Sequence, residues 1–214
     1  MVPVFCVPLQ TNMAEDKKNK QIITHGHPYV EIDGVKWATM NVGAKDVADS
    51  GLYFAWGETK GYKPEDVENE VKLFRSDEYK FGRFVKYNEE DKLIVLQPQN
   101  DPVKVNWRGN WRLPTQEEFL HLTSKEGWGY VENYRGMRGN LLVTDNSQEL
   151  FFPFAGYLYD GEFGNFPVGG YYWASSVCND YNGYAYNAYF SQQSRGVGSN
   201  ARYIGFPVRG VLGD

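Results

Sequence analysis

Aromatic residues crowd the last third of the chain, yet Gly, Asn and Ser interrupt every apolar run there. From Phe151 onward the sequence contains no Lys and few acidic residues. Short runs separated by turn residues predict short strands joined by loops. Tyr, Ser, Gly, Asn and Arg are also the residues that recognition surfaces favour. Two interpretations follow: a loop-rich β domain with aromatics in its strands, or a surface that binds a ligand.

Composition narrows the class of protein. The chain has 214 residues, which is enough to bury a substantial core, and its hydrophobic content of 42% fits a globular protein. The formal net charge of -5 leaves no basic stripe to neutralise phosphates, so we expect no nucleic-acid partner. No run of about 18 apolar residues occurs, so we expect no membrane span.

The N-terminal segment is apolar and then charged, and Pro3 and Pro8 interrupt its apolar part. A signal peptide needs a basic start and a longer apolar core, so the export signal is weak, and Met13 is an alternative start. We expect residues 1–27 to be disordered and residues 28–214 to form a single domain. Residues 60–92 are charged and weakly periodic, which predicts a surface insertion.

Local signals place a hairpin and a helix. Val30 and Ile32 alternate with polar residues before Asp33-Gly34, a dipeptide typical of a tight hairpin turn. Thr115 and Glu118 have the spacing of a capping box, with Thr115 as the N-cap of a helix. Elsewhere we predict short strands at 141–144, 150–153, 156–159, 171–175, 184–190 and 204–211.

These elements predict an α+β fold with few helices, short antiparallel strands and high loop content. Pro207 lies inside the last predicted strand, which indicates an edge position or a bulge there.

Five motifs occur in order along the chain. They are Trp37-Ala38-Thr39-Met40-Asn41-Val42-Gly43, Tyr53-Phe54-Ala55-Trp56-Gly57-Glu58, Trp111-Arg112-Leu113-Pro114-Thr115, Tyr172-Trp173-Ala174-Ser175-Ser176 and Gly205-Phe206-Pro207-Val208-Arg209. Together they resemble the Fibrobacter-succinogenes-type major paralogous domain, common in gut Bacteroidetes. The resemblance covers residues 28–211 and implies a C-type-lectin-like fold. That fold is similar in architecture to formylglycine-generating enzymes and to the variable proteins of diversity-generating retroelements, so it does not by itself imply a function.

The last motifs also resemble the borders of a retroelement variable region. In such proteins, adenine-directed mutagenesis rewrites Asn-type codons between a fixed start and a fixed end. Here Trp173–Ser176 and Gly205–Arg209 bracket a mixed segment. An undiversified paralogue would acquire similar residues by drift, so both origins stay open.

We predict that this segment carries the ligand-binding residues. They are Tyr181, Asn182, Tyr184, Tyr186, Arg195, Asn200, Arg202 and Tyr203. We expect the tyrosines and Arg202 to lie together and largely exposed.

No sequence motif groups the Cys and His residues that catalysis or metal binding would need. The resemblance to formylglycine-generating enzymes implies a Cys pair, but Cys6 lies outside the matched region and Cys178 has no second Cys nearby. His25 and His27 precede the domain, and we expect His121, on the predicted helix, to be a surface or boundary residue. We therefore predict no enzyme activity and no cofactor.

Calcium-dependent lectins suggest one further comparison. The stretch Gln97-Pro98-Gln99-Asn100-Asp101 resembles their metal loop but precedes the helix, which is the wrong place. We accordingly predict no metal site.

The motif residues themselves are expected to form the scaffold. We predict that Trp37, Trp56, Trp111 and Trp173 lie in the core, and that Arg112 and Arg209 are pairing residues that fix loops.

The sequence thus predicts a non-catalytic adhesin-type or receptor-type domain that binds a protein or glycan outside the cell or at its surface. Alternatives are a phage receptor-binding protein, a pilus-tip or surface-assembly subunit, and an enzyme of the formylglycine-generating superfamily.

Overall fold

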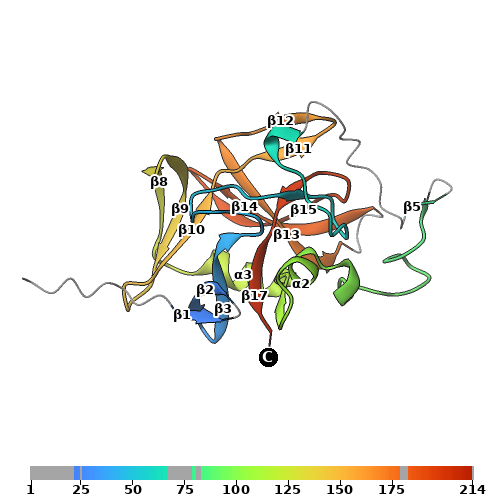
Figure 1. Ribbon diagram of the computed structural model, residues 1–214, viewed down its shortest axis with the longest axis horizontal. Helices are drawn as coiled ribbons and strands as arrows, with labels where there is room; N and C mark the ends of the chain where they lie inside the picture. Colours follow the sequence, from blue (N-terminus) through green and yellow to red (C-terminus); the bar gives the residue numbers. More distant parts are fainter. Residues whose placement is uncertain (1–21, 25, 67–78, 81–82, 179–182, 214) are drawn as a thin grey trace, which may run out of the picture.

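The computed structural model describes residues 22–24, 26–66, 79–80, 83–178 and 183–213 (Figure 1). Antiparallel strands make up most of its regular structure and helices are few, so the α+β class is confirmed, with a bias toward strand. The helical elements are η1 (Pro64–Asp66), η2 (Pro98–Asn100), α2 (Pro102–Trp107) and α3 (Gln116–Ser124). The strands are β1 (Ile22–Thr24), β2 (His27–Ile32), β3 (Val35–Asn41), β4 (Tyr53–Phe54), β5 (Tyr79–Lys80), β6 (Arg83–Phe84), β7 (Trp111–Arg112), β8 (Trp128–Tyr134), β9 (Met137–Val143), β10 (Glu149–Pro153), β11 (Tyr157–Tyr159), β12 (Glu162–Gly164), β13 (Gly169–Val177), β14 (Tyr184–Ser191), β15 (Arg195–Ala201), β16 (Phe206–Pro207) and β17 (Arg209–Leu212).

The largest sheet joins the two ends of the described chain. Its order is β1-β2-β3-β17-β7, so β17 pairs with β3 on one side and with β7 on the other. The β2–β3 hairpin turns at Asp33 and Gly34, whose φ angles are 49° and 84°, and this confirms the predicted hairpin. Strand β1 lies within the segment 1–27 for which we expected disorder, and it is the first regular element of the described residues. Residues 1–21 lie outside the described residues.

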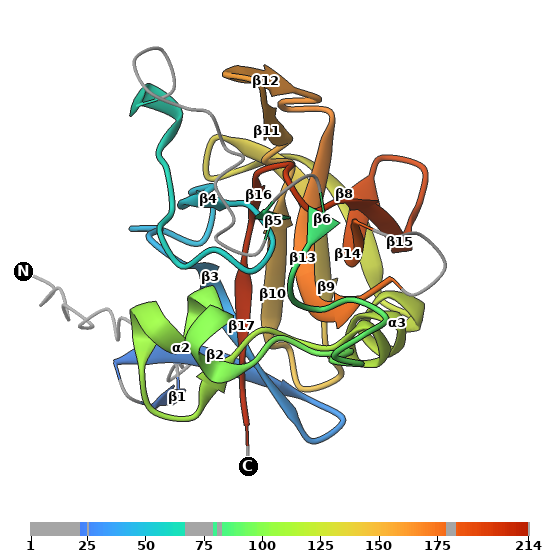
Figure 2. The same ribbon diagram turned by 90° about the vertical axis from the view of Figure 1, so that its right-hand side faces the viewer.

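Two three-stranded antiparallel sheets form the rest of the framework. Their orders are β10-β9-β8 and β13-β14-β15, and three two-stranded ladders join β11 to β12, β16 to β4 and β5 to β6. The β11–β12 hairpin stands at the end of the molecule opposite α2 and β1 (Figure 2).

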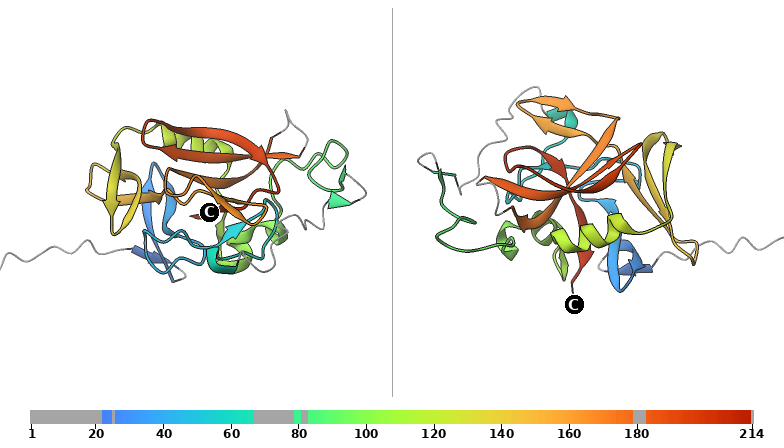
Figure 3. Two further views of the ribbon diagram at one scale, coloured as in Figure 1. Left: turned by 90° about the horizontal axis from the view of Figure 1, so that it is seen from above. Right: turned by 180° about the vertical axis from the view of Figure 1, so that it is seen from behind.

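Helix α3 begins where the sequence predicts it. Glu118 N donates to the Thr115 hydroxyl at 3.2 Å, and Thr115 N donates to the Glu118 carboxylate at 2.7 Å, which completes a capping box. The helix buries Phe119 and Leu122 and lies against strands β13, β14 and β15 (Figure 3). It therefore fixes one face of the sheet that carries much of the predicted binding segment.

Aromatic side chains fill the two larger clusters of buried residues. Phe119, Phe152 and Phe190 belong to one, which also includes Trp37. The other cluster contains the remaining motif tryptophans, Trp56, Trp111 and Trp173. All four motif tryptophans are almost wholly buried, so their assignment to the core is confirmed.

The predicted surface insertion at 60–92 contributes Tyr87 to the core. Tyr87 is fully buried, and its ring centroid lies 5.1 Å from that of Trp56. Residues 67–78 and 81–82 of the insertion lie outside the described residues.

The predicted strand 204–211 is two strands with different partners. β16 pairs with β4, whereas β17 pairs with β3 and β7. Pro207 ends β16 opposite Tyr53 in a ladder of only two strands, which agrees with the predicted edge position.

Candidate ligand-binding site

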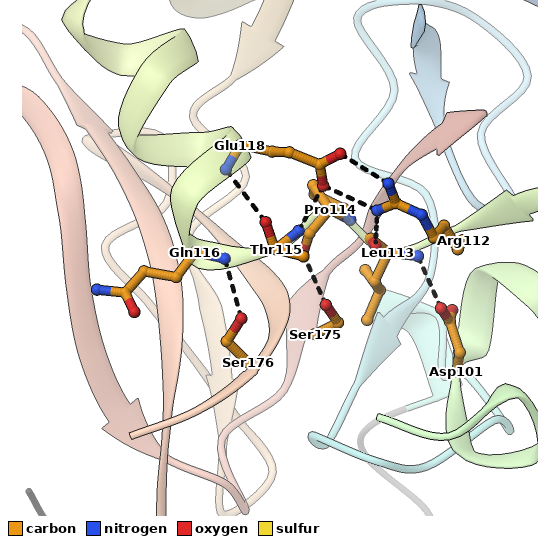
Figure 4. A network of polar contacts seen from close by, with 9 residues as sticks. All are labelled: Asp101, Arg112, Leu113, Pro114, Thr115, Gln116, Glu118, Ser175 and Ser176. Carbon is orange, nitrogen blue, oxygen red and sulfur yellow. Dashed lines mark hydrogen bonds and ion pairs between the residues drawn. The ribbon is translucent and has the colours of Figure 1, made fainter. Parts of the chain in front are cut away.

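Two of the sequence motifs are tied together by hydrogen bonds (Figure 4). Ser175 donates to the Pro114 carbonyl from its backbone N at 2.8 Å and from its hydroxyl at 3.2 Å. Gln116 N donates to the Ser176 hydroxyl at 3.0 Å. Strand β13 is therefore fixed to the start of α3 immediately before the chain enters the predicted binding segment.

The charged groups of this network also hold backbone in place. Arg112 donates to both carboxylate oxygens of Glu118, at 2.8 and 2.7 Å, and Leu113 N donates to Asp101 at 2.8 Å. Burial raises the pKa of Glu118, but hydrogen bonds from Arg112 and Thr115 outweigh this and hold the pKa below its usual value. Burial raises the pKa of Asp101, and the backbone N–H donors around it only partly oppose the rise. The charged groups of this network therefore stabilise the fold.

Arg209 fixes the far side of the segment. Its guanidinium is fully buried and donates to Asn41 Oδ1 at 2.8 Å, to Ala38 O at 3.0 Å and to Phe151 O at 3.0 Å. It also lies 4.4 Å from the centroid of the Phe152 ring. Burial lowers the pKa of Arg209 to about 10. The prediction of a buried pairing arginine is confirmed here, and the strands that it joins are β3 and β10.

Of the predicted binding residues, two tyrosines are exposed. Tyr184 begins β14 and is 39% exposed, and Tyr203 follows β15 and is 37% exposed. The Tyr203 ring lies 5.6 Å from that of Tyr159, a residue that the sequence did not single out. Tyr181 and Asn182 lie outside the described residues.

Arg202 is buried, and our expectation of an exposed side chain was wrong. It is only 3% exposed, and its guanidinium lies 4.8 Å from the Trp56 ring and 4.6 Å from the Phe84 ring. It donates to Tyr87 O at 2.8 Å and to Tyr184 O at 3.2 Å. The arginine therefore anchors the turn after β15, because cation–π contacts and carbonyl acceptors compensate for lost hydration.

Tyr186 also differs from the expected exposed face, and the predicted binding residue Arg195 lies elsewhere. Tyr186 is half-buried and packs against the core cluster of Phe119 and Phe190. Arg195 donates to Thr123 O at 2.9 Å and to Lys125 O at 3.1 Å, at the C-terminal end of α3. It begins β15, at the opposite end of that strand from Asn200. The six predicted residues that the structure describes therefore do not form one continuous surface.

A hollow of about 370 Å³ lies beside the exposed Tyr203. We call it the tyrosine hollow. Its lining residues are Tyr157, Tyr159, Asn165, Tyr171, Asn200, Tyr203, Ile204 and Phe206. Two predicted binding residues, Asn200 and Tyr203, are among them. Strands β11, β13, β15 and β16 and their connecting turns thus converge on one concave surface.

The sequence interpretation missed the β11–β12 side of this hollow. Tyr157 and Tyr159 flank the buried Leu158, and this alternation was the available signal, since side chains on a strand point to opposite faces in turn. Asn165 follows β12 directly, and its side-chain amide donates to the Tyr171 hydroxyl at 2.7 Å.

None of the described residues that line the tyrosine hollow has a charged side chain. Partial burial raises the pKa of Tyr203, and the neighbouring Tyr159 and Tyr184 hydroxyls raise it further. The Tyr159 and Tyr184 hydroxyls therefore lie near that of Tyr203. Such a site can offer hydrogen bonds and ring faces, but no counter-ion for a charged ligand.

A second hollow, of about 290 Å³, lies between residues 87–94 and the end of β13. Val177, Cys178 and Arg202 line it on one side. Cys178 is buried and forms no disulfide with any residue in the described ranges. Arg202 already has a structural role there, and the segment 179–182 that follows Cys178 lies outside the described residues.

The other described candidate residues make contacts that stabilise the fold. His27 stacks on Trp107 at 4.0 Å, and His121, exposed as predicted, lies 2.6 Å from Asp33. Asp101, from the calcium-loop-like stretch, is buried and caps α2 by accepting from Val103 N and Lys104 N. Across the part of the chain that the structure describes, no three His, Cys, Asp or Glu residues are grouped to hold a metal ion.

Comparisons with protein-family models, with curated proteins and with solved structures each find no match to this chain. Among the helices of the described residues, none has the length and apolar character needed to cross a membrane.

Proposed function

We propose that this protein is a non-catalytic ligand-binding domain of C-type-lectin-like fold that recognises its ligand through the tyrosine hollow and the adjoining Tyr184. The observation that carries the proposal is an uncharged concave surface lined by four tyrosines and two asparagines. Clefts of about 300–1,000 Å³ with a few placed polar groups are typical of binding sites. Tyr supplies large, rigid contact area at low entropic cost.

The pairing of N-terminal strands with the C-terminal strand supports the proposed fold. β2 and β3 share a sheet with β17, and the β13-β14-β15 sheet packs on α3. The ordered motifs supply the contacts that hold these parts together, through Ser175, Ser176 and Arg209. The relation to retroelement variable proteins remains part of this proposal and rests on the bracketing motifs alone.

The proposal is of binding rather than catalysis, because the charged groups nearest the motifs are engaged in holding backbone. Asp101 accepts from three backbone N–H groups, and Arg112 and Glu118 pair with each other. A catalytic group instead needs a polar atom presented to a substrate in a pocket. We propose that the ligand is met outside the cell or at its surface.

Serine substitution of the three exposed tyrosines tests this function. The triple variant Tyr159→Ser, Tyr184→Ser and Tyr203→Ser should melt close to the wild type, since these rings are exposed. Binding to a partner found on protein and glycan arrays should fall strongly, because aromatic anchors of this kind each contribute about 2 kcal/mol. Leu120→Ser, at an exposed position on α3, is the matched control and should bind normally.

Unchanged binding by a folded triple variant would disprove the proposed site. Unfolding of the triple variant would show that the tyrosines are part of the core. Oxygen-dependent oxidation of a cysteine-containing peptide by the wild type would favour the formylglycine-generating alternative. Incorporation into a pilus would favour the surface-assembly alternative.

A further inference from the structure

We propose that the tyrosine hollow takes a neutral sugar ring of a glycan, an assignment of ligand class that rests on the proposed function. Four features of the hollow support this class: its charge, its size, its hydrogen-bonding groups and its exposed rings.

The lack of charged residues in the lining argues against ionic ligands. None of the eight lining residues is acidic or basic, although the chain as a whole contains 22 Lys and Arg and 27 Asp and Glu. Phosphate and carboxylate groups bind most strongly to Arg or Lys, and ammonium groups bind to carboxylates. A ligand seated in this hollow is therefore uncharged where it touches the protein.

Size favours a small ring over a broad protein surface. At about 370 Å³ the hollow lies near the lower end of the usual range for small-molecule sites. A stable protein partner usually covers about 800 Å² on each side. One or two sugar rings match the hollow better than such a partner does.

Hydrogen-bonding groups in the hollow are held in fixed directions. The Asn165 amide nitrogen donates to the Tyr171 hydroxyl at 2.7 Å, and the Asn200 amide nitrogen donates to Asn187 Oδ1 at 2.9 Å. Both amide oxygens therefore remain as acceptors, and the Tyr171 hydroxyl retains its proton to donate; none of these three has another partner among the described residues. Two acceptors beside a donor match the hydroxyl groups of a sugar, each of which donates and accepts.

Exposed rings supply the apolar part of the site. Tyr159 and Tyr203 are 48% and 37% exposed, and their planes meet at 38°. One face of a pyranose ring presents C–H groups, which pack on an aromatic face while the hydroxyls at the ring edge reach polar groups. An amphipathic Tyr wall beside amide oxygens provides both surfaces.

A protein ligand is the rival occupant. Phe166 and Val168 are exposed next to Asn165, and a protein partner would cover them as well as the tyrosines. A sugar ring seated in the hollow would not need them, because neither lines it. This difference separates the two ligand classes experimentally.

The test is an array of neutral and sialylated oligosaccharides, probed with the full chain in EDTA. We expect binding to neutral glycans, with affinities then measured by titration calorimetry. Tyr203→Ala should lower affinity about tenfold through loss of ring contact. Asn165→Leu should lower it about as much, because one acceptor is removed. Phe166→Ser is the matched control and should bind like the wild type.

Several outcomes would overturn the sugar assignment. One is the absence of any neutral glycan signal from the folded wild type, and another is full retention of affinity by both Tyr203→Ala and Asn165→Leu. A protein ligand that is lost with both Tyr203→Ala and Phe166→Ser would refute the sugar assignment while leaving the proposed binding function intact. Circular dichroism spectra of each variant establish that the fold is preserved.

Discussion

Trp173 shows how a single residue of a motif contributes to the scaffold. Its indole N–H donates to Phe54 O at 2.9 Å, and its ring lies 4.3 Å from that of Phe206. The side chain thus fills space between β13, β4 and β16. Truncation would leave a cavity and would remove the indole donor to the Phe54 carbonyl.

We predict that Trp173→Ala lowers the free energy of unfolding by about 3–5 kcal/mol, as is typical when a buried tryptophan is truncated. Urea denaturation followed by circular dichroism measures the loss. Leu120→Ala is the control, since Leu120 is 55% exposed and its change should stay within about 0.5 kcal/mol. Equal stability of the two variants would refute the core role of Trp173.

Arg202 marks a limit of sequence interpretation at the residue scale. It lies between Ala201 and Tyr203 in a polar, glycine-rich stretch, and nothing local indicates burial. Its surroundings come from Trp56, Phe84 and the Tyr87 carbonyl, all more than a hundred residues earlier. Only the tertiary fold brings such partners together, so the sequence predicted the exposed Tyr203 correctly and its buried neighbour wrongly.

Helix α3 was predictable because its start signal is local. Thr115 and Glu118 lie three residues apart and satisfy each other's backbone N–H groups. The carboxylate of Glu118 also pairs with Arg112, so one side chain stabilises both the helix cap and strand β7.

We predict that Thr115→Ala costs about 1 kcal/mol of stability, as loss of an N-cap usually does. Thr115→Ser is the control and should retain most of the wild-type stability, because its hydroxyl can accept the same hydrogen bond. Chemical denaturation at neutral pH measures both changes. A Thr115→Ala variant as stable as the wild type would show that the cap contributes nothing.

Acid should weaken the same cap. The folded-state pKa of Glu118 lies below 4.5, so its contribution is complete above that pH and is lost as the pH falls through the folded-state pKa. We predict that Glu118→Gln is less stable than the wild type at neutral pH and that the difference shrinks in acid. Unfolding curves measured from pH 7 down to pH 3 test this, and a difference that grows in acid would contradict it.

Other elements were not predicted because contacts with neighbouring elements, rather than local sequence signals, stabilise them. Strand β15 has the sequence RGVGSNA, which is poor in β-branched and aromatic residues, yet it forms a continuous antiparallel ladder with β14 from Arg195 to Ala201. Helix α2 has only six residues, too few to show a periodic pattern. The tyrosine hollow depends on β15 and on the β11–β12 hairpin, so only its Asn200 and Tyr203 side was predicted.

The two core clusters meet at Arg209. Its donors reach β3 on one side and β10 on the other, and its guanidinium lies over Phe152. No carboxylate contributes to these hydrogen bonds, so three neutral oxygens and one ring face compensate for burial of the charge. Loss of the guanidinium would remove a buried donor from each of those oxygens.

We predict that Arg209→Met lowers stability by about 3 kcal/mol or more, because several buried acceptors lose their donor. Tryptophan fluorescence and far-ultraviolet circular dichroism should report the same, lower unfolding midpoint, since both clusters contain tryptophan and depend on this contact. Arg209→Lys, which keeps a charge and fewer well-directed donors, should be intermediate. Two separated transitions in the wild type would show that the clusters unfold independently.

The hydrogen bonds that tie Ser175 and Ser176 to Pro114 and Gln116 affect which positions of the chain can tolerate mutation. They and the Arg209 contacts fasten the borders of residues 177–204 to parts of the chain outside that stretch. Within that stretch, Arg202 and Tyr186 still contribute to the fold, so only the exposed positions are free to vary without loss of structure. Under the proposed function, mutations of the exposed Tyr184 and Tyr203 would change what the molecule recognises while the protein still folds.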